Sequence, residues 1–217
     1  DSAPALIARS TGLELPIEVL SCDEWVASSL LADRYRRGRL FLIGDACHLH
    51  PPFGGYGMNM GVADGVDLGW KLAAVLQRWG GAPLLDSYAI ERRAIHEDVI
   101  AEATANHAVL SNDFWEDLLE QPGTDGDQAR AAIGRRIAAA KVREFHTLGT
   151  VLGGCYRESP VIRFDRDQVF EHDPTAYRPD SSPGCFAPHG WLADGRSLYD
   201  LFGSGFTLLM APAASPA

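Results

Sequence analysis

An aspartate followed by a loop of prolines and glycines is the part of this sequence best suited to chemistry. At neutral pH the side chain of Asp45 only accepts hydrogen bonds, so its natural partner is a hydroxyl-rich ligand such as a ribityl or ribose chain. The loop after it holds prolines that stiffen the backbone and glycines that let a flat ligand lie against the main chain. These loop residues are Pro51, Pro52, Gly54, Gly55 and Gly57.

Two elements must position this loop. Residues 40–43 form a short, wholly apolar run that ends at Gly44, which predicts a central strand of a covered parallel sheet. Ligands bind at the carboxyl ends of strands in such sheets, and Asp45 is expected there. A helix is predicted from Gly57 through Leu76, so the unpaired amides of its first turn and the positive end of its dipole face the loop. That dipole contributes about 0.3 to 1 kcal/mol and favours a redox group that becomes anionic on reduction.

Residues 39–72 resemble the second flavin-binding motif of the FAD-dependent aromatic hydroxylases, the para-hydroxybenzoate hydroxylase-like monooxygenases. The family pattern is a strand, then GDAAH, PPxGGxGxN and a helix that reads DxxNLxWKL. The matching residues are Gly44, Asp45, Ala46, His48, Pro51, Pro52, Gly54, Gly55, Gly57, Asn59, Asp64, Leu68, Trp70, Lys71 and Leu72. The match contains no gap. Cys47 departs from the pattern, because alanine is usual there, and Tyr56 occupies a variable position.

The resemblance implies a role for each part of the loop. Asp45 is expected to hold the ribityl chain of FAD, Pro52 to lie with Pro51 near flavin C4a, and the amides of Met58 and Asn59 to reach N1 and the C2 carbonyl. The predicted cofactor-binding residues are Gly44, Asp45, Pro51, Gly54, Gly55, Gly57, Met58 and Asn59. The residues predicted to line the substrate pocket are Trp25, Phe53 and Tyr56, with core packing an equal alternative for Trp25. No side chain resembles an indispensable catalytic acid or base.

The function implied by the resemblance is that of an FAD-dependent monooxygenase. NADPH or NADH reduces the FAD, and a flavin C4a-hydroperoxide then transfers oxygen to a phenolic or polycyclic, polyketide-like aromatic substrate. One alternative is an FAD-dependent epoxidase or Baeyer–Villiger-type polyketide oxygenase. The other is a non-catalytic, truncated accessory chain.

The predicted fold is α/β (α+β): part of a Rossmann-like FAD/NAD(P)-binding domain with long helices. We expect residues 1–38 to end a substrate-binding sheet, residues 39–175 to form the second part of the FAD-binding domain with a helical extension, and residues 176–217 to begin an incomplete thioredoxin-like domain. The sequence has no GxGxxG segment after a first strand, which FAD binding also requires. The expectation is a fragment of a larger enzyme, inactive alone, that forms a homodimer or associates with the missing N-terminal part.

Further elements are predicted outside the motif. A strand is expected at residues 15–21, a second helix at 84–110, and a third helix at 128–145 after a polar loop at 120–127. The C-terminal stretch from Pro183 resembles the linker and first strand of the thioredoxin-like domain of larger aromatic hydroxylases. Residues 211–217 are predicted to be a disordered tail.

Composition narrows the classes of partner. The chain has 217 residues, 46% of them hydrophobic and 22% charged, which is ordinary for a globular protein. No apolar stretch approaches the roughly twenty residues that span a bilayer. A formal charge of −10 argues against nucleic acid or an anionic membrane as partner. Cys22, Cys47, Cys155 and Cys185 form no CxxC pair, so reduced thiols and a cytoplasmic location are expected.

Several conspicuous residues have plainer explanations. Close packing accounts for Gly61, Gly65 and Gly69 at least as well as cofactor contact does. His48 and His50 look like a metal pair, but the sequence shows no third ligand nearby, so no metal site is predicted. The run from Glu91 to Arg93 is expected to be a solvated or salt-bridged helix face. Asp45 has a simpler alternative as a turn former or helix cap.

Overall fold

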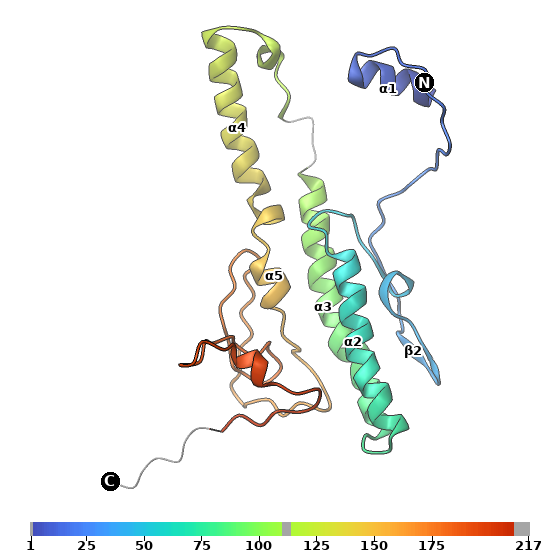
Figure 1. Cartoon of the computed structure of the whole chain (residues 1–217), viewed down its shortest axis with the longest axis vertical. Coiled ribbons are helices and arrows are strands. Elements are labelled where there is room, and N and C mark those ends of the chain that lie inside the picture. The colour runs from blue at the N-terminus through green and yellow to red at the C-terminus, as the bar shows by residue number, and fades with distance from the viewer. Residues whose placement is uncertain (1, 110–113, 211–217) are drawn as a thin grey trace.

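A computed structural model describes residues 2–109 and 114–210, and helices dominate it (Figure 1). The α-helices are α1 (Ala3–Thr11), α2 (Gly57–Leu76), α3 (Ala82–Ala108), α4 (Thr124–Phe145) and α5 (Leu148–Leu152). The 3-10 turns are η1 (Gly44–Ala46), η3 (Asp117–Glu120) and η4 (Leu198–Leu201). The short strands are β1 (Leu30–Leu31), β2 (Arg36–Arg37), β3 (Leu40–Phe41) and β4 (His48–Leu49).

Helices α2 and α3 form the centre of the molecule and lie side by side (Figure 1). The turn between them contains Gly80, where an added Cβ would lie 2.8 Å from Leu84 and 2.9 Å from Ala74. Proline in the first turn of α3 has no amide to leave unpaired, so Pro83 suits that position. Two core clusters follow: Tyr35, Cys47, Leu68 and Tyr88, and Tyr56, Ile95, Val99 and Ala103.

The strands form two small antiparallel pairs. β2 pairs with β3 across a turn at Gly38, with Arg36 opposite Phe41, and β1 pairs with β4. The prediction of a central parallel strand at residues 40–43 is therefore wrong for the described residues, and Leu40 is 73% exposed. A short apolar run reads the same in a hairpin and in a covered sheet, because only its partners differ.

The helix predictions hold better than the strand predictions. α2 spans the predicted range, and α3 runs two residues ahead of the predicted start. α4 begins at Thr124, so the predicted polar loop is shorter than expected. Asp125 and Asp127 lie in the first turn of α4, where carboxylates favour the positive end of the helix dipole.

The strand predicted at residues 15–21 does not form. This stretch is extended but has no strand partner, and the preceding residues form α1, which was not predicted. Pro4 in the first turn and Gly12 at the C-cap, with φ of 69°, bound that helix. Alternating apolar residues predict a strand only where a neighbouring strand exists to pair with.

Residues 153–210 contain little regular structure. An isolated bridge joins Trp191 to Ser197, and the Ser197 and Asp200 side chains form a capping box on η4. The described residues 202–210 form no strand, so the first strand predicted there is absent. The tail predicted at 211–217 lies outside the described residues.

Cys155 and Cys185 form a disulfide, and the expectation of reduced thiols is therefore wrong for this pair. An isolated antiparallel bridge brings these cysteines, 30 residues apart in sequence, together, which their spacing alone did not indicate. Cys22 and Cys47 are free thiols, exposed and buried respectively. Within the described part of the chain, none of the helices has the length and apolar character to cross a membrane.

Candidate functional site

The predicted flavin loop borders a cavity of about 510 Å³. Its lining includes six of the residues predicted to bind cofactor or substrate: Trp25, Asp45, Pro52, Gly55, Gly57 and Met58. His48 and His50 also line it, together with Val26, Ser28 and Leu49. The cavity therefore combines one exposed carboxylate, main chain free of bulky side chains, and the first turn of α2.

Two glycines allow the loop its shape. Gly54 has a φ of 86°, and an added Cβ would collide with the ring of Tyr56. Gly44 has a φ of 57° and lies against Gly61 of α2, where an added Cβ would be 3.5 Å from the Gly44 Cα. The packing explanation for Gly61 thus agrees with the structure, whereas Gly65 and Gly69 have open space beside them.

Some predicted site residues lie elsewhere. Tyr56 is 3% exposed and packs in the α3 core cluster, and its ring is not part of the cavity wall. The Phe53 ring lies 5.2 Å from His107 and 5.5 Å from the Lys141 ammonium, so it contacts α3 and α4. Pro51 is buried, and the side-chain Nδ2 of Asn59 donates to the Gly55 carbonyl at 3.4 Å.

A buried polar cluster lies directly behind the loop and centres on Asp64, which is fully buried. Asp64 Oδ2 accepts from the Gly44 amide at 2.9 Å and lies 3.2 Å from His48 Nε2. Asp64 Oδ1 lies 2.8 Å from Arg92 Nε and 2.9 Å from His96 Nε2. Through Gly44, this cluster holds the backbone turn that carries Asp45.

Charge explains how Asp64 tolerates burial. Burial alone would raise its pKa, but hydrogen bonds from His48, His96 and Arg92 outweigh that effect and hold the pKa well below its usual range. Burial lowers the pKa of His96, which favours its neutral form. Burial, with the negative charge of Asp64 beside it, raises the pKa of the Cys47 thiol to about 12.

A second buried cluster joins α2 and α3 one turn further along. Lys71 is fully buried, lies 2.7 Å from Asp67 and forms an ion pair with Glu91. Tyr156 donates to Asp67 at 3.3 Å and Ser159 donates to Glu91 at 2.5 Å. The salt-bridged alternative is confirmed for Glu91 and Arg92, which pair with Lys71 and Asp64. The solvated alternative is wrong for both, because they are 2% and 5% exposed.

Sequence reasoning missed the role of this interior charge. Asp64 and Lys71 fall in the motif and Arg92 in the charged run after it, but a charged residue on a helix is usually solvated. The signal available was the pairing of opposite charges across two consecutive helices, since buried ions require partners.

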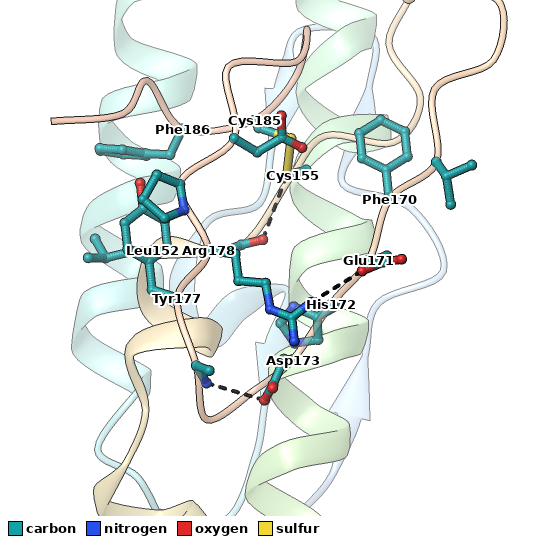
Figure 2. A pocket seen from close by; sticks show the side chains of 15 residues that line it. Leu152, Cys155, Phe170, Glu171, His172, Asp173, Tyr177, Arg178, Cys185 and Phe186 are labelled. Carbon is teal, nitrogen blue, oxygen red and sulfur yellow. Dashed lines mark hydrogen bonds and ion pairs between the residues drawn. A yellow bond between two sulfur atoms is a disulfide. The ribbon is translucent and has the colours of Figure 1, made fainter.

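A separate cavity of about 420 Å³ lies in the C-terminal segment (Figure 2). The Cys155–Cys185 disulfide forms part of its wall, and Arg178 lies across it, 3.5 Å from Glu171. Asp173 caps the turn that follows by accepting from the amides of Thr175 and Ala176. None of the predicted flavin residues lines this cavity.

Comparison with known proteins confirms the resemblance to FAD-dependent monooxygenases. The family profile described as FAD binding domain matches residues 4–103. The FAD-dependent monooxygenase opdD of Penicillium oxalicum is 36% identical over 201 residues, which cover 88% of this chain and 38% of that protein. Aklavinone 12-hydroxylase DnrF of Streptomyces peucetius is 35% identical over 198 residues, which cover 90% and 36%.

Solved structures agree in fold. RebC with bound 7-carboxy-K252c superposes with a TM-score of 0.82 at 37% identity, covering 94% of this chain and 39% of that chain. A ternary complex of aklavinone-11 hydroxylase with FAD and aklavinone gives a TM-score of 0.65 at 33% identity, covering 94% and 35%. These likenesses confirm the predicted α/β fold class. The chain spans less than two fifths of the length of each of these four proteins.

Proposed function

This chain belongs with the FAD-dependent aromatic hydroxylases and carries part of their FAD-binding domain; from that premise we propose that the full-length protein is an FAD-dependent monooxygenase. It would hydroxylate a phenolic or polycyclic, polyketide-like aromatic with NAD(P)H and O2. The single observation that carries the proposal is the cavity that gathers Asp45, Pro52, Gly55, Gly57 and Met58.

The residues around the cavity fit the cofactor. Asp45 is exposed at the cavity and accepts hydrogen bonds, which suits the hydroxyls of a ribityl chain. Gly55 and Gly57 let the flat flavin ring lie against the main chain, and Pro52 stiffens the loop that carries this main chain. The amides of Met58 and Asn59 belong to the first turn of α2, which has no intrahelical acceptors for them.

The residues of this chain would hold the flavin in position and stabilise the negative charge that develops on it. The bound flavin supplies the redox chemistry and the activation of oxygen. The positive end of α2 stabilises negative charge that develops at the cavity, and the Asp64–Gly44 hydrogen bond holds the loop in place. Trp25 lines one side of the cavity with an apolar surface and is itself 69% exposed.

Finer parts of the proposal concern substrate and partners. Trp25 is the predicted substrate residue that reaches the cavity, whereas Phe53 and Tyr56 would need to act from a second layer behind the loop.

The exposed apolar residues Met58, Val62 and Val66 follow one face of α2. That face favours burial against another part of the full-length protein or against a second copy. We propose a cytoplasmic location, where NAD(P)H is available.

An epoxidase or Baeyer–Villiger-type oxygenase uses the same cofactor site, so product analysis distinguishes it from a hydroxylase. A non-catalytic accessory chain needs no flavin.

The test uses the full-length protein. We expect a yellow preparation whose NAD(P)H oxidation is stimulated by a phenol or polycyclic aromatic. Asp45→Asn should lower flavin retention, while Asp125→Asn on exposed α4 should not. A colourless full-length protein that also fails to bind added FAD excludes the proposal.

A further inference from the structure

We propose that Cys47, His48, Asp64 and His96 form a binding site for one zinc-class divalent cation. Each residue offers one donor atom, and the four donor atoms lie within 4.8 Å of one another. All four side chains are buried. They come from the turn after η1, from β4, from α2 and from α3, so the fold and not a sequence motif assembles the site. The proposal does not depend on flavin binding.

The spacing of the donors fits tetrahedral coordination. Zinc binds nitrogen and oxygen at about 2.0 to 2.2 Å and sulfur at about 2.3 Å, which places neighbouring ligands about 3.3 to 3.7 Å apart. His48 Nε2 lies 3.2 Å from Asp64 Oδ2 and Cys47 Sγ lies 3.8 Å from the same oxygen. The His48 and His96 rings are 4.0 Å apart between centroids. Because the four donor atoms lie within 4.8 Å of one another, a bound cation would draw the more distant donors together by up to about 1 Å.

The hydrogen bonds of Asp64 are crowded without a metal. A carboxylate oxygen offers two lone pairs. Three groups face Oδ2, namely the Gly44 amide, the Cys47 thiol and His48 Nε2. A cation bonded to Oδ2 would convert the thiol and imidazole from competing donors into ligands, and the Gly44 amide would keep its hydrogen bond.

Supporting hydrogen bonds of the kind found around metal ligands are present. The other ring nitrogen of His96, Nδ1, lies 2.7 Å from the Tyr35 hydroxyl, which would orient the imidazole. The Gly44 amide holds Asp64 through Oδ2 and Arg92 Nε holds it through Oδ1, so the carboxylate is fixed at both oxygens.

The guanidinium of Arg92 already balances the charge of Asp64 before any cation binds. A divalent cation would therefore need the Cys47 side chain as a thiolate, because buried charges are tolerated only when compensated.

This site differs from the pair suggested by the sequence. His50 Nδ1 lies 2.9 Å from the Pro51 carbonyl oxygen, so His50 is not part of it. The ligands that the sequence did not indicate are Asp64 of α2 and His96 of α3, which are distant in sequence from His48. His48 also lines the flavin-loop cavity, which gives a cation a route of entry.

Cobalt substitution tests the proposal on the full chain, purified without chelator and titrated with Co²⁺ alone. We expect one Co²⁺ per chain, tetrahedral d–d absorption and a thiolate-to-cobalt charge-transfer band, with Zn²⁺ displacing the cobalt. Cys47→Ala should abolish the charge-transfer band. Cys22→Ser removes the exposed free thiol and should leave the spectrum unchanged.

Tyr35→Phe provides a graded test, because loss of a ligand's supporting hydrogen bond typically lowers metal affinity by about 10- to 100-fold. Helical circular dichroism should match the wild type in every variant. A wild-type chain that binds no stoichiometric Co²⁺ overturns the proposal. So does a Cys47→Ala chain with unchanged affinity and spectrum, because the metal then lies elsewhere.

Discussion

Helices α2 and α3 bury charged side chains against each other, whereas residues 153–210 follow an irregular path and expose large apolar side chains. Lys71 is fully buried between two carboxylates, while Trp191 and Phe206 are 75% and 84% exposed. The helix pair is held by matched charges from elements that are close in sequence. The C-terminal segment is held by capped turns and one disulfide, and Tyr156 and Ser159 anchor its start to the helix pair. The two regions should therefore respond to different perturbations.

The largest effect is expected from Lys71→Ala. Removal of one partner of a buried ion network leaves Asp67 and Glu91 without their counter-charge, which costs about 3 to 5 kcal/mol of unfolding free energy. Lys141→Ala is the matched control, because Lys141 pairs with Glu144 nearer the surface and should cost about 1 kcal/mol or less. Urea denaturation of both variants measures the difference. Equal losses would show that the helix pair does not depend on its buried charges.

The disulfide should matter next, and mainly to the C-terminal segment. A native disulfide that closes a loop of this size contributes about 2 to 4 kcal/mol. Cys155→Ser, or reduction by a dithiol, should accelerate proteolysis between residues 156 and 184. Hydrogen exchange of the amides in α2 and α3 measures the other region and should change little. Equal loss of protection in the helix pair would mean that the two regions unfold as one unit.

A smaller effect is expected in the flavin loop. Gly54→Ala introduces a Cβ into the ring of Tyr56 at a positive φ, which should cost about 1 to 3 kcal/mol. Gly55→Ala also has a positive φ, of 67°, but has nothing within 4 Å of the new Cβ. It should therefore cost less. Thermal denaturation of the two variants separates the clash from the backbone strain.

The same contrast explains what the sequence could predict. The range of α2 and the loop before it depend on local signals, namely a proline and glycine loop followed by an apolar helical pattern. The cavity residues Asp45, Pro52 and Gly55 follow from that local geometry.

Features that depend on distant partners could not be predicted in the same way. A strand at residues 15–21 requires a neighbouring strand, and none pairs with it in the described chain. Cys155 and Cys185 meet through a bridge that joins distant loops. The burial of Glu91 and the gathering of His96 with His48 depend on how α3 packs against α2.

The smallest expected effect is a gain in stability, in contrast to the losses above. It distinguishes a glycine of α2 that packs against the loop from one that faces open space. Gly65 has open space around an added Cβ, so Gly65→Ala should stabilise the helix by about 0.5 to 1 kcal/mol through propensity alone. Gly61→Ala gains the same propensity but places its Cβ 3.5 Å from the Gly44 Cα, so it should gain less. Chemical denaturation measures both. If Gly65→Ala instead destabilises, that face of α2 is covered in solution, and the open surface seen beside it belongs to an interface.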